Sequence, residues 1–180
     1  MCWTQHVLDA APRASIPPPV LLFVEAIKAL TQEKYLALCG SAVTHVYMNS
    51  AHCSDYDLRF FNYDLEKLQY QLRSIRGFGN LNPQLIGISY RIIKLEILVG
   101  ADRFDIEIAT VKKGDARTYH KAMMQALADA DFNVGGLYVP LWLDTDGSFE
   151  IRGLPECFKA LDEKKYVSLI TETRCLQKTL

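Results

Sequence analysis

The fold of this chain is decided by residues 35–61, which read YLALCGSAVTHVYMNSAHCSDYDLRFF. The pattern predicts a strand, a tight turn, a helix and a second strand, in that order, over Tyr35–Cys39, Gly40–Ser41, Ser41–Asn49 and Asp55–Phe61. Residues two apart on a strand point to the same face of the sheet. The carboxylates of Asp55 and Asp57 can therefore approach one point in space.

Two carboxylates beside a glycine turn suit a divalent cation and a phosphate. Hard cations prefer oxygen ligands, and Mg²⁺ is usually held by one or two carboxylates together with substrate phosphates. Gly40 lets the backbone approach a phosphate closely, and Ser41 adds a hydroxyl at the start of the predicted helix. Acidic residues that alternate with apolar ones are also typical of the solvated face of a half-buried strand. The pattern alone leaves both interpretations open.

Length and composition are those of one globular domain. The chain has 180 residues, of which 49% are hydrophobic and 23% are charged, and this is enough for a sizeable core. Its 20 basic against 21 acidic side chains argue against nucleic-acid binding over the whole surface, but not against a local basic patch. We expect an irregular segment over residues 1–16 and a single domain over residues 17–180.

Cysteine content and hydropathy bear on the location of the protein. Five cysteines, an odd number, and the lack of a signal-peptide pattern indicate reduced thiols and a cytoplasmic protein. The apolar run Val20–Val24 is far too short to span a membrane, so we expect no membrane partner. Zinc is an alternative suggested by the nearby Cys39, His45, His52 and Cys53. Their spacing matches no usual zinc finger. His52 and Cys53 fit better on a loop over the carboxylates, where His52 could touch the substrate.

The rest of the chain mixes helix and strand signals. Helical spacing or capping predicts helices over Pro18–Thr31, after Asp64, over Tyr119–Ala130 and over Pro155–Lys164. Strand patterns cover Ile86–Val99, Phe104–Thr110, Leu137–Leu143, Ser148–Ile151 and Tyr166–Ile170. Turns are predicted at Gly100–Arg103 and Asp144–Gly147. This mixture indicates an α+β domain with helices packed on a mixed or antiparallel sheet.

A third carboxylate follows on a later strand. After the first predicted hairpin turn, Asp105 and Glu107 alternate with large apolar residues. We expect this strand to lie beside the strand of Asp55 and Asp57, which would bring three carboxylates to one site. Arg59 shares the face of the Asp pair by parity. It either contacts phosphate or neutralises the carboxylates, and the sequence leaves both roles open.

With these residues the chain resembles the DNA polymerase beta-like nucleotidyltransferases. The resemblance is closest to the head domain of bacterial-type tRNA CCA-adding enzymes and poly(A) polymerases, in which a glycine motif, Asp-x-Asp and a third carboxylate follow one another. Residues 39–45 stand at the glycine motif, and Phe-Asp-Ile at 104–106 is similar to the strand of the third carboxylate. The latter match favours Asp105 over Glu107. In all, the resemblance covers about residues 16–170.

The resemblance implies transfer of a nucleoside monophosphate from a nucleoside triphosphate to an acceptor hydroxyl. The acceptor can be an RNA 3′ end, a protein side chain or a small molecule. Mg²⁺, or alternatively Mn²⁺, would be held by the catalytic carboxylates of Asp55, Asp57 and Asp105. The nucleotide-binding residues would be Gly40, Ser41, His52, Arg59 and Asp131. Asp131 belongs to residues 131–138, which look like a worn form of the family's Arg-Arg-Asp-Phe-Thr-x-Asn-Ala.

Several positions depart from the family pattern. Thr44 and His45 replace the Arg-Asp of the glycine motif, and Asp129-Ala130 replaces the paired arginines. Losing these arginines removes strong bidentate phosphate contacts. We expect a head-like domain without neck and body domains, and therefore no stand-alone CCA addition. The alternative function is a degenerate, non-catalytic binding or interaction module, and a third hypothesis is that the sequence is a fragment of a longer enzyme.

Overall fold

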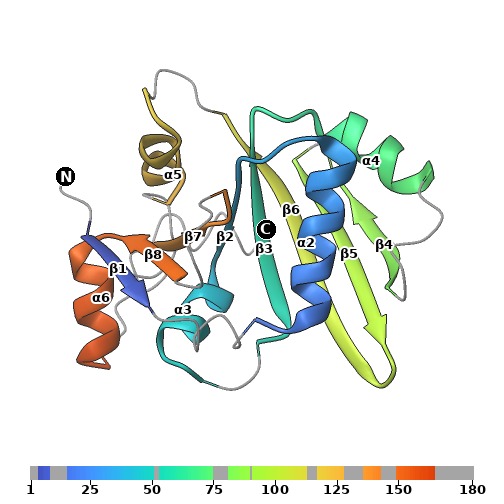
Figure 1. Ribbon diagram of the computed structural model, residues 1–180. Helices are drawn as coiled ribbons and strands as arrows, with labels where there is room; N and C mark the ends of the chain where they lie inside the picture. The colour runs from blue at the N-terminus through green and yellow to red at the C-terminus, as the bar shows by residue number, and fades with distance from the viewer. Residues whose placement is uncertain are drawn as a thin grey trace, which may run out of the picture.

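The computed structural model describes residues 4–8, 16–50, 53–74, 81–89, 91–112, 117–127, 136–142 and 149–164. Its elements, shown in Figure 1, are β1 (Thr4–Leu8), α2 (Pro18–Thr31), β2 (Leu36–Cys39), α3 (Ser41–Tyr47), β3 (Asp55–Phe61), α4 (Leu65–Ser74), β4 (Asn82–Ile88), β5 (Ile92–Val99), β6 (Asp102–Val111), α5 (Tyr119–Leu127), β7 (Leu137–Pro140), β8 (Phe149–Gly153) and α6 (Pro155–Asp162). The predicted α+β class is confirmed.

The described strands form one mixed sheet in the order β1-β8-β7-β2-β3-β6-β5-β4. All neighbouring pairs are antiparallel except β3 and β6, which run parallel. One expectation was wrong: the segment 1–16 is not irregular throughout, because β1 pairs with β8 at the edge of the sheet. Its backbone finds hydrogen-bond partners at the other end of the chain, which local sequence signals do not reveal.

The element bounds follow the local signals closely in most of the chain. The helix α2 and the strand β3 have the predicted bounds. The strand pattern expected over Ile86–Val99 is in fact two strands, because a turn at Ser89 separates β4 from β5. The first of them, β4, begins earlier than expected, at Asn82. The Ser89 hydroxyl accepts hydrogen bonds from the backbone N–H groups of Arg91 and Ile92 at 3.3 and 3.1 Å. The predicted turn at 144–147 and strand at 166–170 lie outside the described residues.

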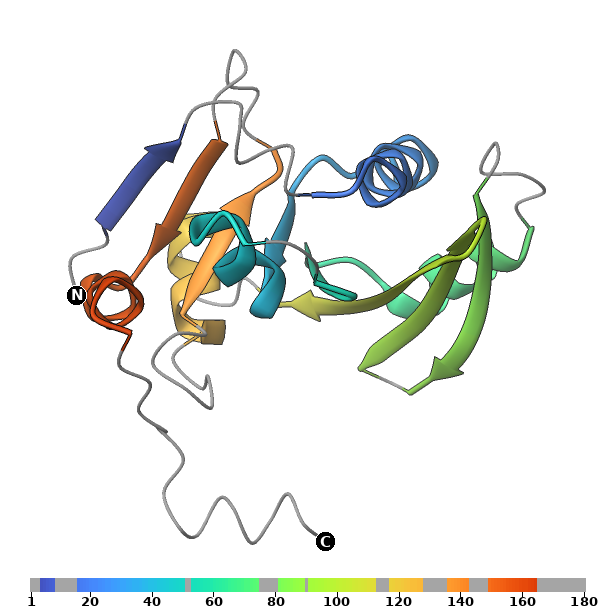
Figure 2. The same cartoon turned by 90° about the horizontal axis from the view of Figure 1, so that it is seen from below.

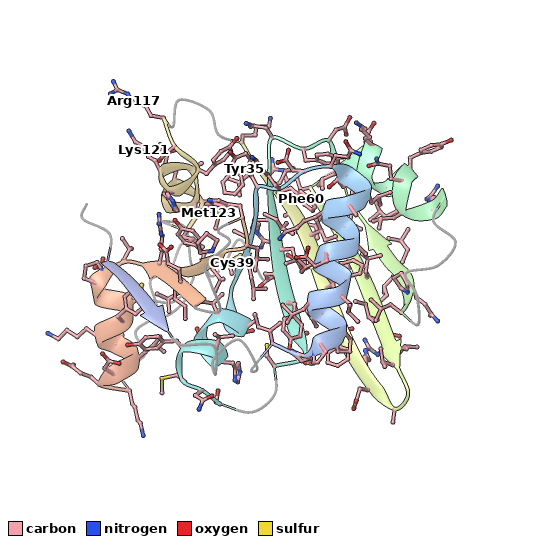
Figure 3. All side chains as sticks on the ribbon, viewed as in Figure 1. Tyr35, Cys39, Phe60, Arg117, Lys121 and Met123 are labelled. Atoms are coloured by element: carbon pink, nitrogen blue, oxygen red, sulfur yellow. The ribbon has the colours of Figure 1, made fainter. Side chains whose placement is uncertain are left out.

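The core has two layers, one on each face of the sheet, and successive side chains of β2 point alternately into one and the other. Leu36 and Leu38 point to a large cluster that also contains the apolar faces of α2, α3, α4 and α6. Ala37 and Cys39 point to the opposite face, where α5 packs on the sheet. Figures 1 and 2 show α2 lying across one face of the sheet. Figure 3 shows Met123 of α5 beside β2, which carries Cys39.

The face that α5 covers continues past this helix over β3, β6 and β5. There the alternate residues are charged, while their neighbours Leu58, Ile106 and Leu95 are buried in the large cluster. This polar extension of the sheet positions the candidate site. Within the described residues, no helix is long and apolar enough to cross a membrane.

Candidate functional site

The register of the parallel pair β3 and β6 brings the predicted carboxylates together. Asp55 pairs with Asp105, and Asp57 pairs with Glu107. Partners in register share a face of the sheet, and adjacent strands lie about 4.8 Å apart. The predicted adjacency of the two acidic strands is thus confirmed. The same face continues onto β5, where Glu96 pairs with Asp105.

A cavity of about 630 Å³ opens on this face. It is lined by residues of β3, β4, β5 and β6 and by the first residue of α3, which are Ser41, Asp55, Tyr56, Asp57, Ile86, Lys94, Leu95, Arg103, Asp105, Ile106 and Glu107. The cavity therefore joins the glycine turn to all three predicted catalytic carboxylates. Ser41 is exposed, and its hydroxyl lies 3.4 Å from the thiol of Cys53.

Gly40 stands directly against the Asp57 carboxylate. Its backbone has φ 74° and ψ −155°, a region that only glycine adopts without strain. A Cβ atom at this position would lie 2.2 Å from Asp57 Oδ2. Glycine is thus required by both the turn and the carboxylate beside it.

Arg59 lies between two carboxylates of the same face. Its Nη2 atom is 3.8 Å from Asp57 Oδ1 and 3.7 Å from Glu107 Oε1. Burial raises the pKa of Asp57 above its ordinary value; Arg59 opposes this effect, whereas Glu107 and Asp55 add to it. Of the two roles left open by the sequence, the contacts of Arg59 fit charge neutralisation. A phosphate-binding role for it stays a prediction.

Three charged residues of the site were not singled out from the sequence. Arg103 Nε lies 3.0 Å from Asp105 Oδ1 and 2.8 Å from Glu96 Oε2. Lys94 Nζ lies 3.4 Å from Glu107 Oε2. Strand parity could have identified Lys94 and Glu96, because they alternate with buried residues of β5 just as the acidic residues do on β6. Arg103 had been placed in the predicted turn over 100–103, but it belongs to β6.

The donor set fits Mg²⁺ better than zinc. Among the described residues, no three His, Cys, Asp or Glu side chains are placed to hold a metal ion together. Asp55 and Asp57 nevertheless supply two carboxylates on one face, the number that Mg²⁺ takes from a protein when phosphates complete its ligands. Burial raises the pKa of Cys39 to about 12, so this thiol stays neutral and is a poor zinc ligand. His52 and Asp131 lie outside the described residues.

The mixed sheet of this chain, with its packed helices, is a fold that proteins of known structure also have. Solved structures of CCA-adding enzymes share it. The apo form I structure has 15% sequence identity and a TM-score of 0.64 over 91% of this chain. The complex with ATP has 16% identity and a TM-score of 0.61 over 89%. The Thermotoga maritima enzyme complexed with tRNA has 17% identity and a TM-score of 0.60 over 89%.

The similarity is one of fold and extends over part of those enzymes. This chain covers 37%, 35% and 35% of the three solved chains, respectively. No family profile and no curated protein sequence matches the chain. The predicted resemblance to the head domain of CCA-adding enzymes is therefore confirmed at the level of three-dimensional structure.

Proposed function

We propose that this protein is a Mg²⁺-dependent nucleotidyltransferase, which moves a nucleoside monophosphate from a nucleoside triphosphate to an acceptor hydroxyl. The observation that carries the proposal is a single cavity lined by Ser41 and by the carboxylates of Asp55, Asp57 and Asp105. Similar folds have been solved with ATP and with tRNA, which supports a triphosphate as the ligand and an RNA 3′ end as one acceptor to test.

Each group of the cavity has a chemical role in this transfer. Asp55 and Asp57 would hold Mg²⁺, while Gly40 and Ser41 would receive the triphosphate. The bound ion would neutralise charge on the triphosphate and activate the acceptor hydroxyl. Asp105 would orient that hydroxyl together with its metal ion and would take the proton of the hydroxyl. The acceptor oxygen then bonds to the α-phosphorus, the bond from this phosphorus to the bridging oxygen breaks, and pyrophosphate leaves.

A non-catalytic binding module is the second candidate, and the ion pairs of the site favour it. Asp57 and Asp105 are both paired with arginines of the same face, Arg59 and Arg103. A carboxylate that is already neutralised by a protein cation has less affinity for a metal ion. In this case the cavity would bind a nucleotide or another partner without transferring a group.

Label transfer separates the two candidates. The protein is incubated with Mg²⁺, each labelled nucleoside triphosphate, and RNA, protein or small-molecule acceptors. We expect transfer that Asp55→Asn or Asp57→Asn lowers by at least about 100-fold, since a metal site contributes several kcal/mol to such reactions. Asp64→Asn, which keeps the oxygen that caps α4, is the matched control and should retain activity. Mg²⁺-dependent triphosphate binding without transfer would support the binding module, and the absence of both would exclude the enzyme.

The Asp57→Asn variant also needs a stability readout, so that inactivity is not confused with unfolding. Burial raises the folded-state pKa of Asp57; hence the folded state loses stability as the pH rises through that pKa and the carboxylate ionises. The neutral asparagine avoids this cost. We expect Asp57→Asn to have a Tm at pH 7 equal to or above that of the wild type.

A further inference from the structure

Arg103 holds two carboxylates at once. It lies at the start of β6, directly after the turn at Gly100, and it shares a face of the sheet with Asp105. A single atom, Arg103 Nε, is 3.0 Å from Asp105 Oδ1 and 2.8 Å from Glu96 Oε2. The carboxylate that would orient the acceptor is thus engaged by a cation of the protein itself.

The two partners of Arg103 differ in exposure. The Glu96 side chain is only 14% exposed, whereas the Arg103 side chain is 59% exposed. Glu96 is therefore a fixed anchor on β5. The arginine head lies over the surface at the end of a long flexible stem, so it can change partners while its strand remains paired.

Arg103 would compete with a divalent cation for the carboxylate of Asp105. Within the described part of the face, carboxylates outnumber cations, the cations being Arg59, Lys94 and Arg103 and the carboxylates Asp55, Asp57, Glu96, Asp105 and Glu107. A divalent cation at Asp105 must approach the guanidinium of Arg103 or displace it. Both charges are positive, so the arginine weakens the binding of the metal.

We propose that Arg103 and Glu96 form a latch on Asp105. The latch keeps a divalent cation from Asp105 in the free protein, and it opens when the phosphates of a bound triphosphate draw the Arg103 guanidinium away. Arg103 and Ser41 line the same cavity, so a triphosphate at the glycine turn would share that cavity with the guanidinium. This inference rests on the proposed nucleotidyltransferase function, and it makes metal binding depend on the nucleotide.

Mn²⁺ alone is the probe that tests the latch. Free Mn²⁺ is measured by electron paramagnetic resonance during titration of the full chain without nucleotide. We expect Arg103→Gln to bind Mn²⁺ about tenfold more tightly than the wild type, since one nearby positive charge is removed. The gain should vanish in Arg103→Gln/Asp105→Asn. The control Arg117→Gln removes an equal charge beside α5, far from the β5–β6 turn (Figure 3), and should match the wild type.

The outcomes separate the latch from the function on which it rests. Equal Mn²⁺ affinity in the wild type and Arg103→Gln overturns the latch. A gain in affinity that persists in Arg103→Gln/Asp105→Asn also overturns it, because the freed Glu96 would then be the ligand. A second measurement, equilibrium dialysis of a labelled non-hydrolysable triphosphate with and without Mn²⁺, reports on the proposed function. Mn²⁺-dependent retention of the triphosphate leaves that function standing if the latch fails. Retention in none of the proteins overturns both.

Discussion

At the scale of single residues, Gly40 links backbone conformation to the chemistry of the site. Its φ and ψ angles lie where L-residues are strained, and the space for a side chain is taken by Asp57 Oδ2. The glycine therefore allows a carboxylate to stand against the turn. From the sequence, glycine was expected here because a phosphate must approach the backbone. The structure adds a second reason, which is that the Asp57 carboxylate occupies the space of a side chain.

Replacement of Gly40 by alanine should destabilise the protein by about 1–3 kcal/mol from the backbone alone, with a further cost from the displaced Asp57 carboxylate. Gly100→Ala is the matched control. Gly100 also has a positive φ, of 62°, but apart from its chain neighbours no atom of the described residues lies within 4 Å of a Cβ built there, so only a backbone cost of about 1 kcal/mol is expected. Urea unfolding measures both values. In an Asp57→Ala background the cost of Gly40→Ala should fall, and an unchanged cost would contradict the role given to the contact.

Which residues face the site could be predicted, but not which ones pair. Strand parity alone puts Asp55 and Asp57 on one face, and it does the same for Asp105 and Glu107. The partners of these groups depend on register between strands and on the reach of long side chains. For this reason the contact of Arg103 with Glu96 on the neighbouring strand was not predicted from the sequence.

At the scale of elements, local signals gave correct predictions where the determinants of structure are local. The Asp64 carboxylate accepts hydrogen bonds from the backbone N–H groups of Glu66 and Lys67 at 2.9 and 3.3 Å, so it caps α4 as its position predicts. Proline at 18 begins α2 as expected. The strand β1 was missed because its only described partner, β8, lies near the other end of the chain.

The contact between α5 and the sheet contains a histidine, His120, whose pKa is lowered by burial. His120 of α5 bonds through Nδ1 to the hydroxyl of Tyr138, and its Nε2 atom meets Nη1 of Arg152. Arg152 in turn pairs with the buried Glu150. Since arginine only donates hydrogen bonds, Nε2 must accept. His120 is therefore neutral in the folded state, with its proton on Nδ1.

We expect the free energy of unfolding to fall as the pH is lowered through 6.5, the ordinary pKa of histidine. Burial, and then the charge of Arg152, lower the folded-state pKa of His120, so the unfolded chain takes up the proton first. The loss begins near pH 6.5 and is complete below the folded-state pKa. Measured as Tm against pH, it should be reduced in His120→Gln and kept in Lys121→Gln, the exposed neighbour (Figure 3). The same slope in both variants would assign it to other groups.

At the scale of the whole molecule, the site lies where two parts of the sheet join. The strand β2 with the glycine turn belongs to the part that contains β1, β8 and β7, and β3 begins the part that contains β6, β5 and β4. The α+β class followed from local patterns. Of the strand order, the adjacency of β3 and β6 was predicted, but the rest was not, because pairing between distant segments is decided by burial in the complete fold. Figure 2 shows how strongly the resulting sheet is twisted.

A core substitution on β3 tests whether the two parts unfold as one unit. Leu58 is fully buried and pairs with Leu38 of β2 and Ile108 of β6, so Leu58→Ala should lower the free energy of unfolding by about 2–5 kcal/mol. Leu22→Ala on α2, where the side chain is 60% exposed, should change it by less than about 0.5 kcal/mol. In a Trp3→Phe background, the fluorescence of Trp142, which packs on Phe61, reports on the α5 side, and far-UV circular dichroism reports on the whole sheet. The unfolding transitions measured by fluorescence and by circular dichroism should coincide in each variant. Different midpoints for the two signals would mean that the part carrying the glycine turn unfolds independently of the part carrying the carboxylates.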